Sequence, residues 1–471
     1  MSSPFSIFRG ESARVAGDLV HRRRIGAAMG KYEAARGPRQ QAFRSWERAR
    51  QAAAETKWSA VNRLAEHLEQ FEAAAVARGT QVHWCRDADE ARAVMVGIIR
   101  GHGARRIVKS KVMTSEEIHL NPLLESLGFS VVESDLGEYI QQLKDEAPYH
   151  FVFPCMHLSR EEISDLFRER LGTEPVTDPG ELTMIARRVL REKYVQADIG
   201  ITGANFLVAD TGMISITENE GNARLTAALP RVMISLVGIE KVVPRMADLA
   251  LFLPMLATAG TGQPMTCYNT LYGGPRRPGE QDGPEEWHVI LLDNGRTELL
   301  ADAEQRDALH CIRCGACLNV CPVFRAIGGL SYGTTYQGPV GSVITPHLRG
   351  LQEWKHLSGA SSLCGACTET CPVKIDLHHH LLHNRRNAAA QRGGVERWLW
   401  KGFGAVMRRP WLYRSVLRVS RWLRPLHRVF LEGGGWDPVR VWTAARELPE
   451  LPAETFRDQW RRRQRERSPG A

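Results

Sequence analysis

Hydrophobic positions in the first eighty residues recur with helical spacing. Trp58, Val61, Leu64, Leu68 and Phe71 follow one another at intervals of three or four residues, in a segment rich in Ala, Arg, Glu and Gln. Residues three and four apart share one face of a helix, so this periodicity is typical of amphipathic helices. We therefore expect a helical N-terminal segment over residues 1–80.

From residue 81 the pattern changes to short β-branched and aromatic runs that alternate with helical stretches. The predicted strands are residues 106–108, 129–133, 151–153, 197–202, 213–217, 231–237 and 288–292. Such alternation is typical of an α/β domain with a largely parallel sheet. Because turn-forming residues crowd positions 273–286 and 293–295, we expect an exposed loop there and the end of the domain at residue 303.

Seven of the ten cysteines lie between residues 311 and 371, while Cys85, Cys155 and Cys267 are scattered. A thiol cluster in a chain of 471 residues favours metal binding over disulfides. The first run, Cys311, Cys314, Cys317 and Cys321 followed by Pro322, matches the Cys-x-x-Cys-x-x-Cys-x-x-x-Cys-Pro run of bacterial ferredoxins. The second run has Cys364, Cys367 and Cys371 before Pro372, with Ser361 in the first position. We assign residues 304–385 to an α-helical ferredoxin-type domain with two [4Fe–4S] clusters.

In ferredoxins the fourth cysteine of each run binds the other cluster. This rule assigns cluster 1 to Cys311, Cys314, Cys317 and Cys371, and leaves Cys321, Cys364 and Cys367 for cluster 2. Cluster 2 is one thiolate short, and three interpretations stay open. It is a [3Fe–4S] cluster, or a [4Fe–4S] cluster whose fourth ligand is Ser361, water or Cys267, or its open iron is occupied by a partner or substrate. The Gly- and Pro-rich residues 331–346 between the two runs predict a loop followed by a helix.

Several segments resemble the lactate utilisation protein B family. They include Ser-Asp-Leu-Gly-Glu-Tyr-Ile at 134–140, Ala-Asp-Ile-Gly-Ile-Thr-Gly-Ala-Asn at 197–205, Glu-Asn-Glu-Gly-Asn-Ala-Arg at 218–224 and Leu-Cys-Gly-Ala-Cys-Thr-Glu at 363–369, with further matches at 238–244 and 274–280. The resemblance covers residues 50–430 and includes the three-cysteine second run. It implies an iron–sulfur electron-transfer subunit of an L-lactate oxidation system, with a cysteine-rich subunit and a second α/β-domain subunit as partners. It also implies a sugar-isomerase and coenzyme A transferase-like α/β fold, and the same seven cysteine ligands.

A candidate substrate site follows the predicted strand 213–217. Open α/β sheets bind ligands at the carboxyl ends of their strands, and Arg224 carries a guanidinium that can pair with a carboxylate such as that of lactate. Glu220 and Asn222 are further candidate contacts, and the structural alternative is a tight turn with an internal Arg–Glu pair. No Gly-x-Gly-x-x-Gly or phosphate-binding loop supports a dinucleotide site, and the sequence identifies no catalytic residue.

The C-terminal region, residues 386–471, is basic and rich in tryptophan. Residues 395–430 contain nine Lys or Arg and one Glu, so they carry most of the net charge of +9. Seven of the twelve tryptophans lie within residues 386–471: Trp398, Trp400, Trp411, Trp422, Trp436, Trp442 and Trp460. Three interpretations of this composition stay open. The region docks an acidic partner, it lies on an anionic membrane near a quinone-linked acceptor, or its helices are simply solvated. No recognition motif supports nucleic-acid binding.

The polar N-terminus and the lack of a long apolar window predict a cytoplasmic protein, with a peripheral position at the inner face of the membrane as an option. The expected function is an iron–sulfur electron carrier that passes electrons from lactate to a downstream acceptor. The alternative is an oxidoreductase subunit whose α/β domain itself binds lactate or an acyl substrate.

Overall fold

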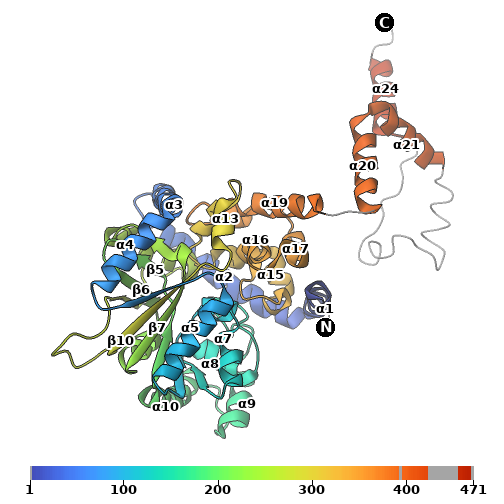
Figure 1. The fold of residues 1–471 in the computed structure, drawn as a ribbon. Helices are drawn as coiled ribbons and strands as arrows, with labels where there is room; N and C mark the ends of the chain where they lie inside the picture. The colour runs from blue at the N-terminus through green and yellow to red at the C-terminus, as the bar shows by residue number, and fades with distance from the viewer. Residues whose placement is uncertain (1–2, 392–394, 423–453, 468–471) are drawn as a thin grey trace. The chain divides into compact units, whose positions relative to one another are not determined.

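The computed structural model describes residues 3–391, 395–422 and 454–467. The chain divides into two compact units, Met1–Ala390 and Gln391–Ala471 (Figure 1). The first unit contains the N-terminal helices, the α/β part and all ten cysteines. The parts that form the candidate site therefore all belong to the first unit.

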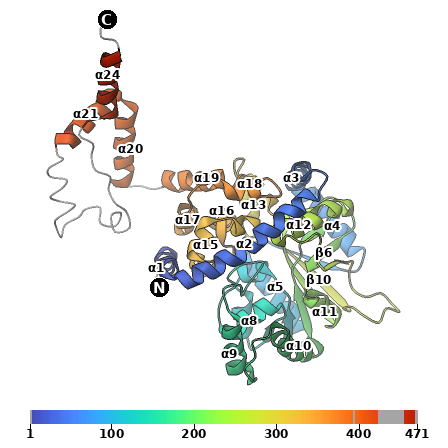
Figure 2. The ribbon, with the colours of Figure 1, turned by 180° about the vertical axis from the view of Figure 1, so that it is seen from behind.

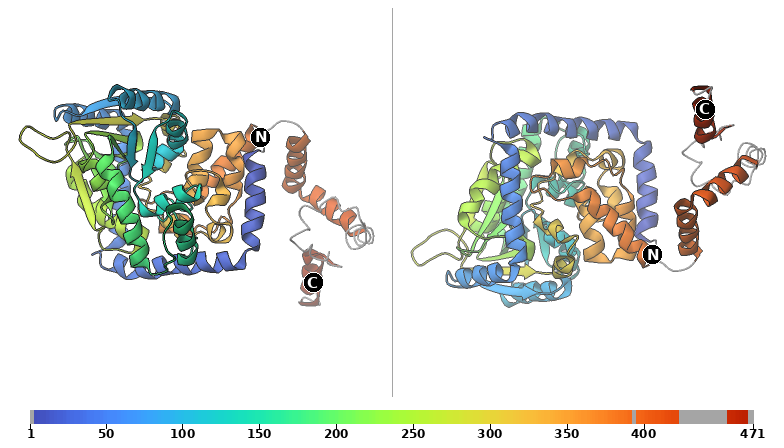
Figure 3. Two further views of the ribbon diagram at one scale, coloured as in Figure 1. Left: turned by 90° about the horizontal axis from the view of Figure 1, so that it is seen from below. Right: turned by 90° about the horizontal axis from the view of Figure 1, so that it is seen from above.

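Four helices fill the N-terminal segment: α1 (Pro4–Gly17), α2 (Leu19–Gln41), α3 (Trp46–Asn62) and α4 (Leu64–Val76). Asp18 and Ser45 cap α2 and α3 by accepting hydrogen bonds from backbone amides in the first turn. These helices run along the outside of both the α/β part and the cysteine-rich part (Figure 3). The helical prediction for this segment is confirmed, and the helices bracket the two parts that follow.

A six-stranded parallel sheet has the order β1-β10-β7-β4-β2-β3. Its strands are β1 (Gln81–Cys85), β2 (Arg106–Lys109), β3 (Ser130–Glu133), β4 (Ile199–Thr202), β7 (Val232–Gly238) and β10 (Glu286–Leu292). Every residue of β4 and β7 is buried, as expected for central strands covered on both faces. The predicted parallel sheet is thus confirmed.

Helices cover both faces of this sheet. Apolar residues of α4 pack with β1, β7 and β10 on one face, and α5 (Ala88–Gly101) and α7 (Leu120–Ser126) pack on the other. The remaining helices of the α/β part are α6 (Met113–Glu117), α8 (Leu136–Lys144), α9 (Arg160–Leu171), α10 (Pro179–Gln196), α11 (Asn222–Ala228), α12 (Leu249–Thr261) and α13 (Arg296–Ala301), with 3-10 turns η1 (Ile239–Lys241) and η2 (Met246–Asp248). The loop before α8 and the loop before α11 both reach the cavity described below.

A second sheet of four strands has the order β8-β5-β6-β9. It comprises β5 (Phe206–Val208), β6 (Met213–Glu218), β8 (Val242–Val243) and β9 (Tyr268–Tyr272), and β6 pairs antiparallel with both β5 and β9. The predicted strand at 213–217 therefore belongs to this sheet and not to the parallel one.

Residues 151–153 were predicted as a strand, and this prediction is wrong. The His150 ring accepts hydrogen bonds from the amides of Val152 and Phe153 at 2.9 and 3.3 Å. The carbonyl of Val152 accepts a hydrogen bond from Lys111 Nζ at 2.8 Å. Side chains satisfy these backbone groups, so the segment is an irregular loop that needs no sheet partner.

The cysteine-rich part consists of short helices around the same core. They are η3 (Arg306–His310), α14 (Ala316–Asn319), α15 (Pro322–Ile327), η4 (Leu330–Tyr332), α16 (Gly338–Arg349), α17 (Leu351–Gly359), α18 (Ala366–Thr370) and α19 (Leu377–Ala390). Helix α2 contacts α14, α15 and α12, and so joins this part to the α/β part (Figure 2). The predicted loop and helix between the cysteine runs correspond to the segment that ends in α16.

In the second unit the described helices are α20 (Val395–Arg408), α21 (Pro410–Trp422) and α24 (Phe456–Arg467). Trp398, Trp400 and Trp411 are exposed, at 72%, 64% and 63% of their surface. Trp436 and Trp442, two further tryptophans of the basic C-terminal region, lie outside the residues that the structure describes. No helix in the described ranges is long and apolar enough to cross a membrane.

Candidate iron–sulfur sites and the adjoining cavity

The seven clustered cysteines lie around the two short helices α14 and α18, which contact each other. Gly315 begins α14 with a φ of +81°, and a Cβ there would come within 2.8 Å of Val152 and 3.0 Å of His150. Only glycine tolerates both this backbone angle and this close approach. The turn between Cys314 and Cys317 is therefore pressed against the irregular loop of the α/β part.

Four thiols form one neighbouring group, which consists of Cys311, Cys314, Cys317 and Cys371. Burial raises the pKa of the Cys314 thiol, and the nearby Cys371 and Cys311 raise it further. Burial likewise raises the pKa of Cys371 to about 12, with Cys311 adding to the effect. Cys317 is also buried beside Cys311 and Cys314. Cys371 thus joins the three thiols of the first run, although it is fifty-four residues beyond Cys317 in the chain.

The second group contains the other three thiols, Cys321, Cys364 and Cys367. Burial raises the pKa of Cys367 to about 11, and the adjacent Cys321 and Cys364 raise it too. Cys364 is exposed, whereas Cys367 is buried. The pKa of Cys317 is raised by Cys367 as well as by its own group, so the two groups are neighbours.

The donor set fits iron–sulfur clusters. All seven cysteines are free of disulfides, and four of them, Cys314, Cys317, Cys367 and Cys371, are buried. Backbone amides of Arg313, Phe324 and Ile375 donate to the sulfurs of Cys311, Cys321 and Cys371 at 3.4, 3.5 and 3.4 Å. Converging buried sulfurs that receive N–H bonds are suited to a soft metal cluster, because thiolates bind it and the amides offset their charge.

The two protein candidates for the fourth ligand of cluster 2 lie in different places. The Ser361 hydroxyl, in the first position of the second run, accepts a hydrogen bond from the Leu363 amide at 3.1 Å. Cys267 is exposed and lies just before β9, where its amide donates to Asn219 Oδ1 at 3.1 Å. Ser361 belongs to the loop that carries Cys364, whereas Cys267 belongs to the α/β part.

Buried charges surround the first thiol group. Arg313 lies between Cys311 and Cys314 in the chain, pairs with Glu240 at 3.2 Å and stacks 4.7 Å from the centre of the Tyr336 ring. Lys57, from the N-terminal helix α3, donates to the carbonyls of Glu240 and Val242 at 2.6 and 3.2 Å. Burial lowers the pKa of Lys57 to about 7. Cations from two separate parts of the chain, Arg313 and Lys57, therefore lie beside the first group.

A cavity of about 630 Å³ adjoins the first thiol group. Cys314, Arg313 and Tyr336 line it from the cysteine-rich part, and Lys241 and Thr261 line it from the α/β part. Its volume lies in the range of cofactor and drug-sized ligand sites. Cys314 of the first group is therefore part of the cavity wall.

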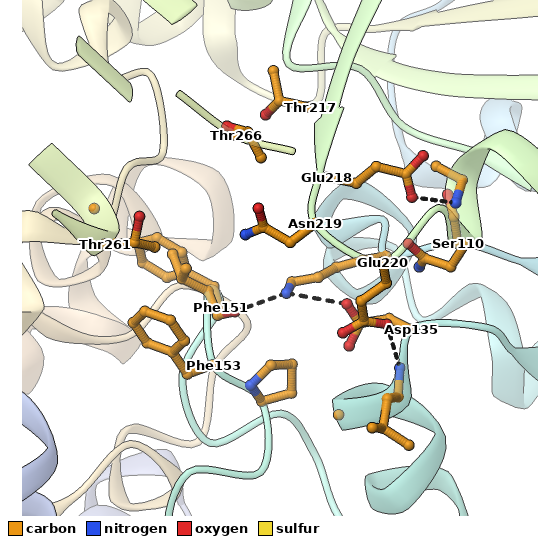
Figure 4. Close-up of a pocket in the computed structure, with 18 of the residues that line it drawn as sticks. Ser110, Asp135, Phe151, Phe153, Thr217, Glu218, Asn219, Glu220, Thr261 and Thr266 are labelled. Carbon is orange, nitrogen blue, oxygen red and sulfur yellow. Dashed lines mark hydrogen bonds and ion pairs between the residues drawn. The ribbon is translucent and has the colours of Figure 1, made fainter. Parts of the chain in front are cut away.

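The other end of the cavity is acidic (Figure 4). Lys111 donates to the carbonyl of Val152 and lies 3.5 Å from Asp135, and Glu220 accepts a hydrogen bond from the Leu136 amide at 3.1 Å. Partial desolvation at the cavity and the neighbouring Asp135 raise the pKa of Glu220 to about 7, although its side chain is still exposed to solvent. This carboxyl group can therefore hold or release a proton near neutral pH.

The structure brings together only some of the candidate substrate contacts. Glu220 and Asn222 line the cavity, and Glu218 caps α11 by accepting from the amides of Ala223 and Arg224 at 2.7 and 2.9 Å. Arg224 is exposed, and its guanidinium carbon lies 5.0 Å from the centre of the Tyr268 ring. It is not among the residues that line the cavity.

Two basic residues of the cavity wall, Lys241 and Arg313, were not singled out from the sequence. Arg313 is one of the unspecified positions of the first cysteine run, and Lys241 ends a short 3-10 turn. The sequence carries no signal for either, because only the folded chain brings them to one cavity.

Comparison with known proteins agrees with the two parts of this site. Residues 68–292 match the LUD domain, residues 307–375 match the 4Fe-4S dicluster domain, and residues 376–465 match the C-terminal region of lactate utilisation protein B. Lactate utilization protein B of Bacillus velezensis is 43% identical over 453 residues, covering 94% of each chain. The chain belongs to the lactate utilisation protein B family. The Bacillus subtilis member of this family is 41% identical over 92% of each chain.

A solved structure of a DUF162 family protein from Deinococcus radiodurans also matches part of this family member. It covers 49% of this chain and 98% of its own, with 17% sequence identity and a TM-score of 0.28. A lactate utilisation protein B with a 4Fe-4S dicluster domain fits a role in lactate oxidation.

Proposed function

We propose that this protein is an iron–sulfur electron carrier of L-lactate oxidation, which passes electrons from lactate to a downstream acceptor. The observation that carries the proposal is the exchange of thiols between the two runs. Cys371 of the second run joins the first group, and Cys321 of the first run joins the second. This exchange is the ligand arrangement that two adjacent ferredoxin-type clusters require.

Cys311, Cys314, Cys317 and Cys371 would hold cluster 1, and Cys321, Cys364 and Cys367 would hold cluster 2. Such clusters supply one-electron transfer at potentials that their surroundings tune. Cys317 and Cys367 join the two groups, so electrons can pass between them. Exposed Cys364 offers a route to a partner at the surface, because electron transfer falls off with distance and cluster 2 would be the more accessible of the two.

The fourth position of cluster 2 is the open part of the ligand set. Ser361 lies in the same loop as Cys364 and is the nearer protein candidate along the chain, with water or a [3Fe–4S] cluster as the alternatives. Cys267 is held by Asn219 in the α/β part, which makes it the weaker candidate. An incoming partner or substrate at an open iron remains the third interpretation.

The partners in this proposal are a cysteine-rich subunit and a second α/β-domain subunit, and the α/β part shares the sugar-isomerase and coenzyme A transferase-like fold. The protein acts in the cytoplasm, with a peripheral, quinone-linked position at the inner membrane face as a further option. Helices α20 and α21 supply a docking surface, because exposed Trp398, Trp400 and Trp411 alternate with basic residues.

Anaerobic purification followed by iron and sulfide analysis and EPR tests the proposal. About eight irons with spin-coupled reduced cubes would support two [4Fe–4S] clusters, and about seven irons with a signal in the oxidised protein would support one [3Fe–4S] cluster. Near-zero iron, or zinc in its place, would refute the electron carrier. The Cys267→Ser variant is the control for the fourth ligand, since unchanged iron and EPR spectra exclude Cys267.

The cavity favours a second candidate function, in which the α/β part itself binds lactate or an acyl substrate. Its wall contains Glu220 and Asn222 as well as Cys314 of the first group. Isolated protein that reduces an artificial dye with lactate would support this function. Activity that appears only with the partner proteins would support the carrier alone.

A further inference from the structure

Two cations that line the cavity have no ion-pair partner among the described residues, Lys241 and Arg160, and of these only Arg160 is exposed to solvent. Lys111 is paired with Asp135, Lys57 donates to two carbonyls, and Arg313 is paired with Glu240. The ammonium group of Lys241 forms no hydrogen bond or salt bridge with any residue in the part of the chain that the structure describes. An enclosed charge without a partner is costly, so this group favours a counter-ion.

Arg313 supplies a second free donor beside it. Its side chain is only 9% exposed and lies beside the Cys311 sulfur, and its Nη1 atom has no hydrogen-bond partner within the described ranges. Both residues line the same cavity, and Arg313 is close enough to Lys241 to lower its pKa. Burial is the main cause of that lowering, to about 8, which leaves Lys241 charged at neutral pH.

The two ends of the cavity have opposite character, and this polarity orients a ligand. Asp135, Glu218 and Glu220 line the far end, where an anion would be repelled. Lys241 and Arg313 line the end that touches Cys314, where an anion would be attracted. Apolar residues also line the cavity, among them Phe151, Ile140 and Leu256.

We infer that Lys241 and Arg313 anchor the carboxylate of a small organic acid of the 2-hydroxy or 2-oxo class, against the wall formed by Cys314. The identity of the acid rests on the proposed function, whereas the anchor rests on the two free donors. A planar guanidinium edge beside an ammonium suits a carboxylate. The hydroxyl or keto end of the ligand then points along the cavity toward the acidic residues.

The size of the cavity adds a specificity prediction. A volume of about 630 Å³ leaves room for a longer side chain than that of lactate. Part of the cavity wall is apolar, so each added methylene that reaches an apolar side chain strengthens binding. We expect 2-hydroxyhexanoate to bind roughly tenfold more tightly than lactate.

Binding of pyruvate, lactate and 2-hydroxyhexanoate to the anaerobic, cluster-loaded protein tests the anchor by calorimetry. Lys241→Met keeps the length of the side chain and removes its charge, and we expect at least tenfold weaker binding with unchanged iron content. Lys241→Arg should retain binding, and Lys31→Met, at an exposed position on α2, is the matched control. Unchanged affinity in Lys241→Met, or no carboxylate binding by the wild-type protein, would overturn the anchor.

Three further measurements separate the anchor from other roles of Lys241. Pyruvate should change the EPR spectrum of the reduced protein, because its carboxylate lies beside a ligand of cluster 1. If Lys241→Met shifts the cluster potential but leaves carboxylate affinity unchanged, Lys241 only balances the cluster charge and the anchor fails. The neutral methyl ester of pyruvate should bind at least tenfold more weakly than pyruvate to the wild-type protein, a result that no folding defect can mimic. Equal binding of ester and acid would refute the anchor, while absent iron would refute the carrier function separately.

Discussion

A buried ion-pair network joins the cysteine-rich part to the α/β part, and Arg296 is its centre. The Arg296 side chain is 2% exposed, and it pairs with Glu117 at 2.8 Å and with Glu240 at 2.5 Å. Tyr336 donates to Glu117 at 2.6 Å, and Arg313 pairs with Glu240 at 3.2 Å. Replacing Arg296 by Gln leaves two buried carboxylates without their main cation. Breaking a buried pair in this way costs about 3–5 kcal/mol of unfolding free energy.

The pH dependence of stability should change with the same substitution. Burial by itself raises the pKa of Glu240, but Arg296 and Arg313 outweigh it and lower the pKa to about 2. A carboxyl group with a lowered pKa stabilises the fold above its ordinary value of 4.5, and this contribution is lost as the pH falls from there toward 2. The difference in stability between wild type and Arg296→Gln should therefore shrink as the pH falls through this range.

Anaerobic urea unfolding followed by circular dichroism measures this cost, with iron release at visible wavelengths as a second signal. Arg231→Gln is the matched control, because Arg231 forms an exposed pair with Glu285 and its side chain is 81% exposed. We expect its unfolding midpoint to stay at the wild-type value. Adding Glu240→Gln to Arg296→Gln should cost less than the sum of the two single substitutions by at least about 1 kcal/mol. A loss below about 1 kcal/mol for Arg296→Gln, or strict additivity, would refute the reasoning.

Four further substitutions or deletions test other parts of the site. Cys371→Ser should lower the iron content by about half and remove the EPR signal of cluster 1, whereas equal loss from both clusters would contradict the thiol exchange. Gly315→Ala should destabilise the protein by at least about 2 kcal/mol in urea unfolding, because its φ is +81° and the new Cβ would lie 2.8 Å from Val152. Glu220→Gln should be more stable than wild type by about 1 kcal/mol at pH 8 and equal to it at pH 4. The reason is that the wild-type carboxyl has a pKa of about 7, so it loses its stabilising proton as the pH rises. A thermal-shift series from pH 4 to pH 8 checks this, and a constant difference would exclude Glu220 as the titrating group. Deletion of residues 395–471 should leave the iron content unchanged and weaken partner or liposome binding in a sedimentation assay, and unchanged binding would exclude both docking ideas.

The cysteine ligand set stays a prediction from the sequence, drawn from the spacing within each run and from the ferredoxin exchange of the fourth cysteines. A tight turn between Cys311 and Cys317 places three sulfurs together, and the shared Cys-Pro ending aligns the second run with the first. The parallel sheet could also be predicted, since buried strands such as β4 and β7 are short apolar runs. Residues 151–153 show the same apolar character but serve as a loop, because the His150 ring and Lys111 replace the hydrogen bonds of a sheet partner.

The cavity could not be predicted, because its wall is assembled from distant parts of the chain. Arg224 follows a strand and was the natural candidate for a carboxylate contact, but its side chain stacks on Tyr268 outside the cavity wall. Lys241 and Arg313 carry no local signal, and they become notable only when the fold leaves Lys241 without an ion-pair partner and Arg313 Nη1 without a hydrogen bond at one cavity. Hydrophobic periodicity and motif spacing describe neighbours in sequence, whereas an unpaired buried cation is a property of the tertiary structure.

The proposed position of cluster 1 lies where the α/β part and the cysteine-rich part meet. Cys314 lines the cavity, Cys317 adjoins Cys367, and Cys364 of the second group is exposed. In the proposed function, an electron that enters at the cavity reaches the surface through two neighbouring clusters without leaving this unit. Gly315, Lys57 and Arg296 each bind one part of the unit to another at the first thiol group, so a shift of either part would move the cavity wall away from that group. If the proposal holds, rigid packing at this junction is a condition for electron transfer as well as for stability.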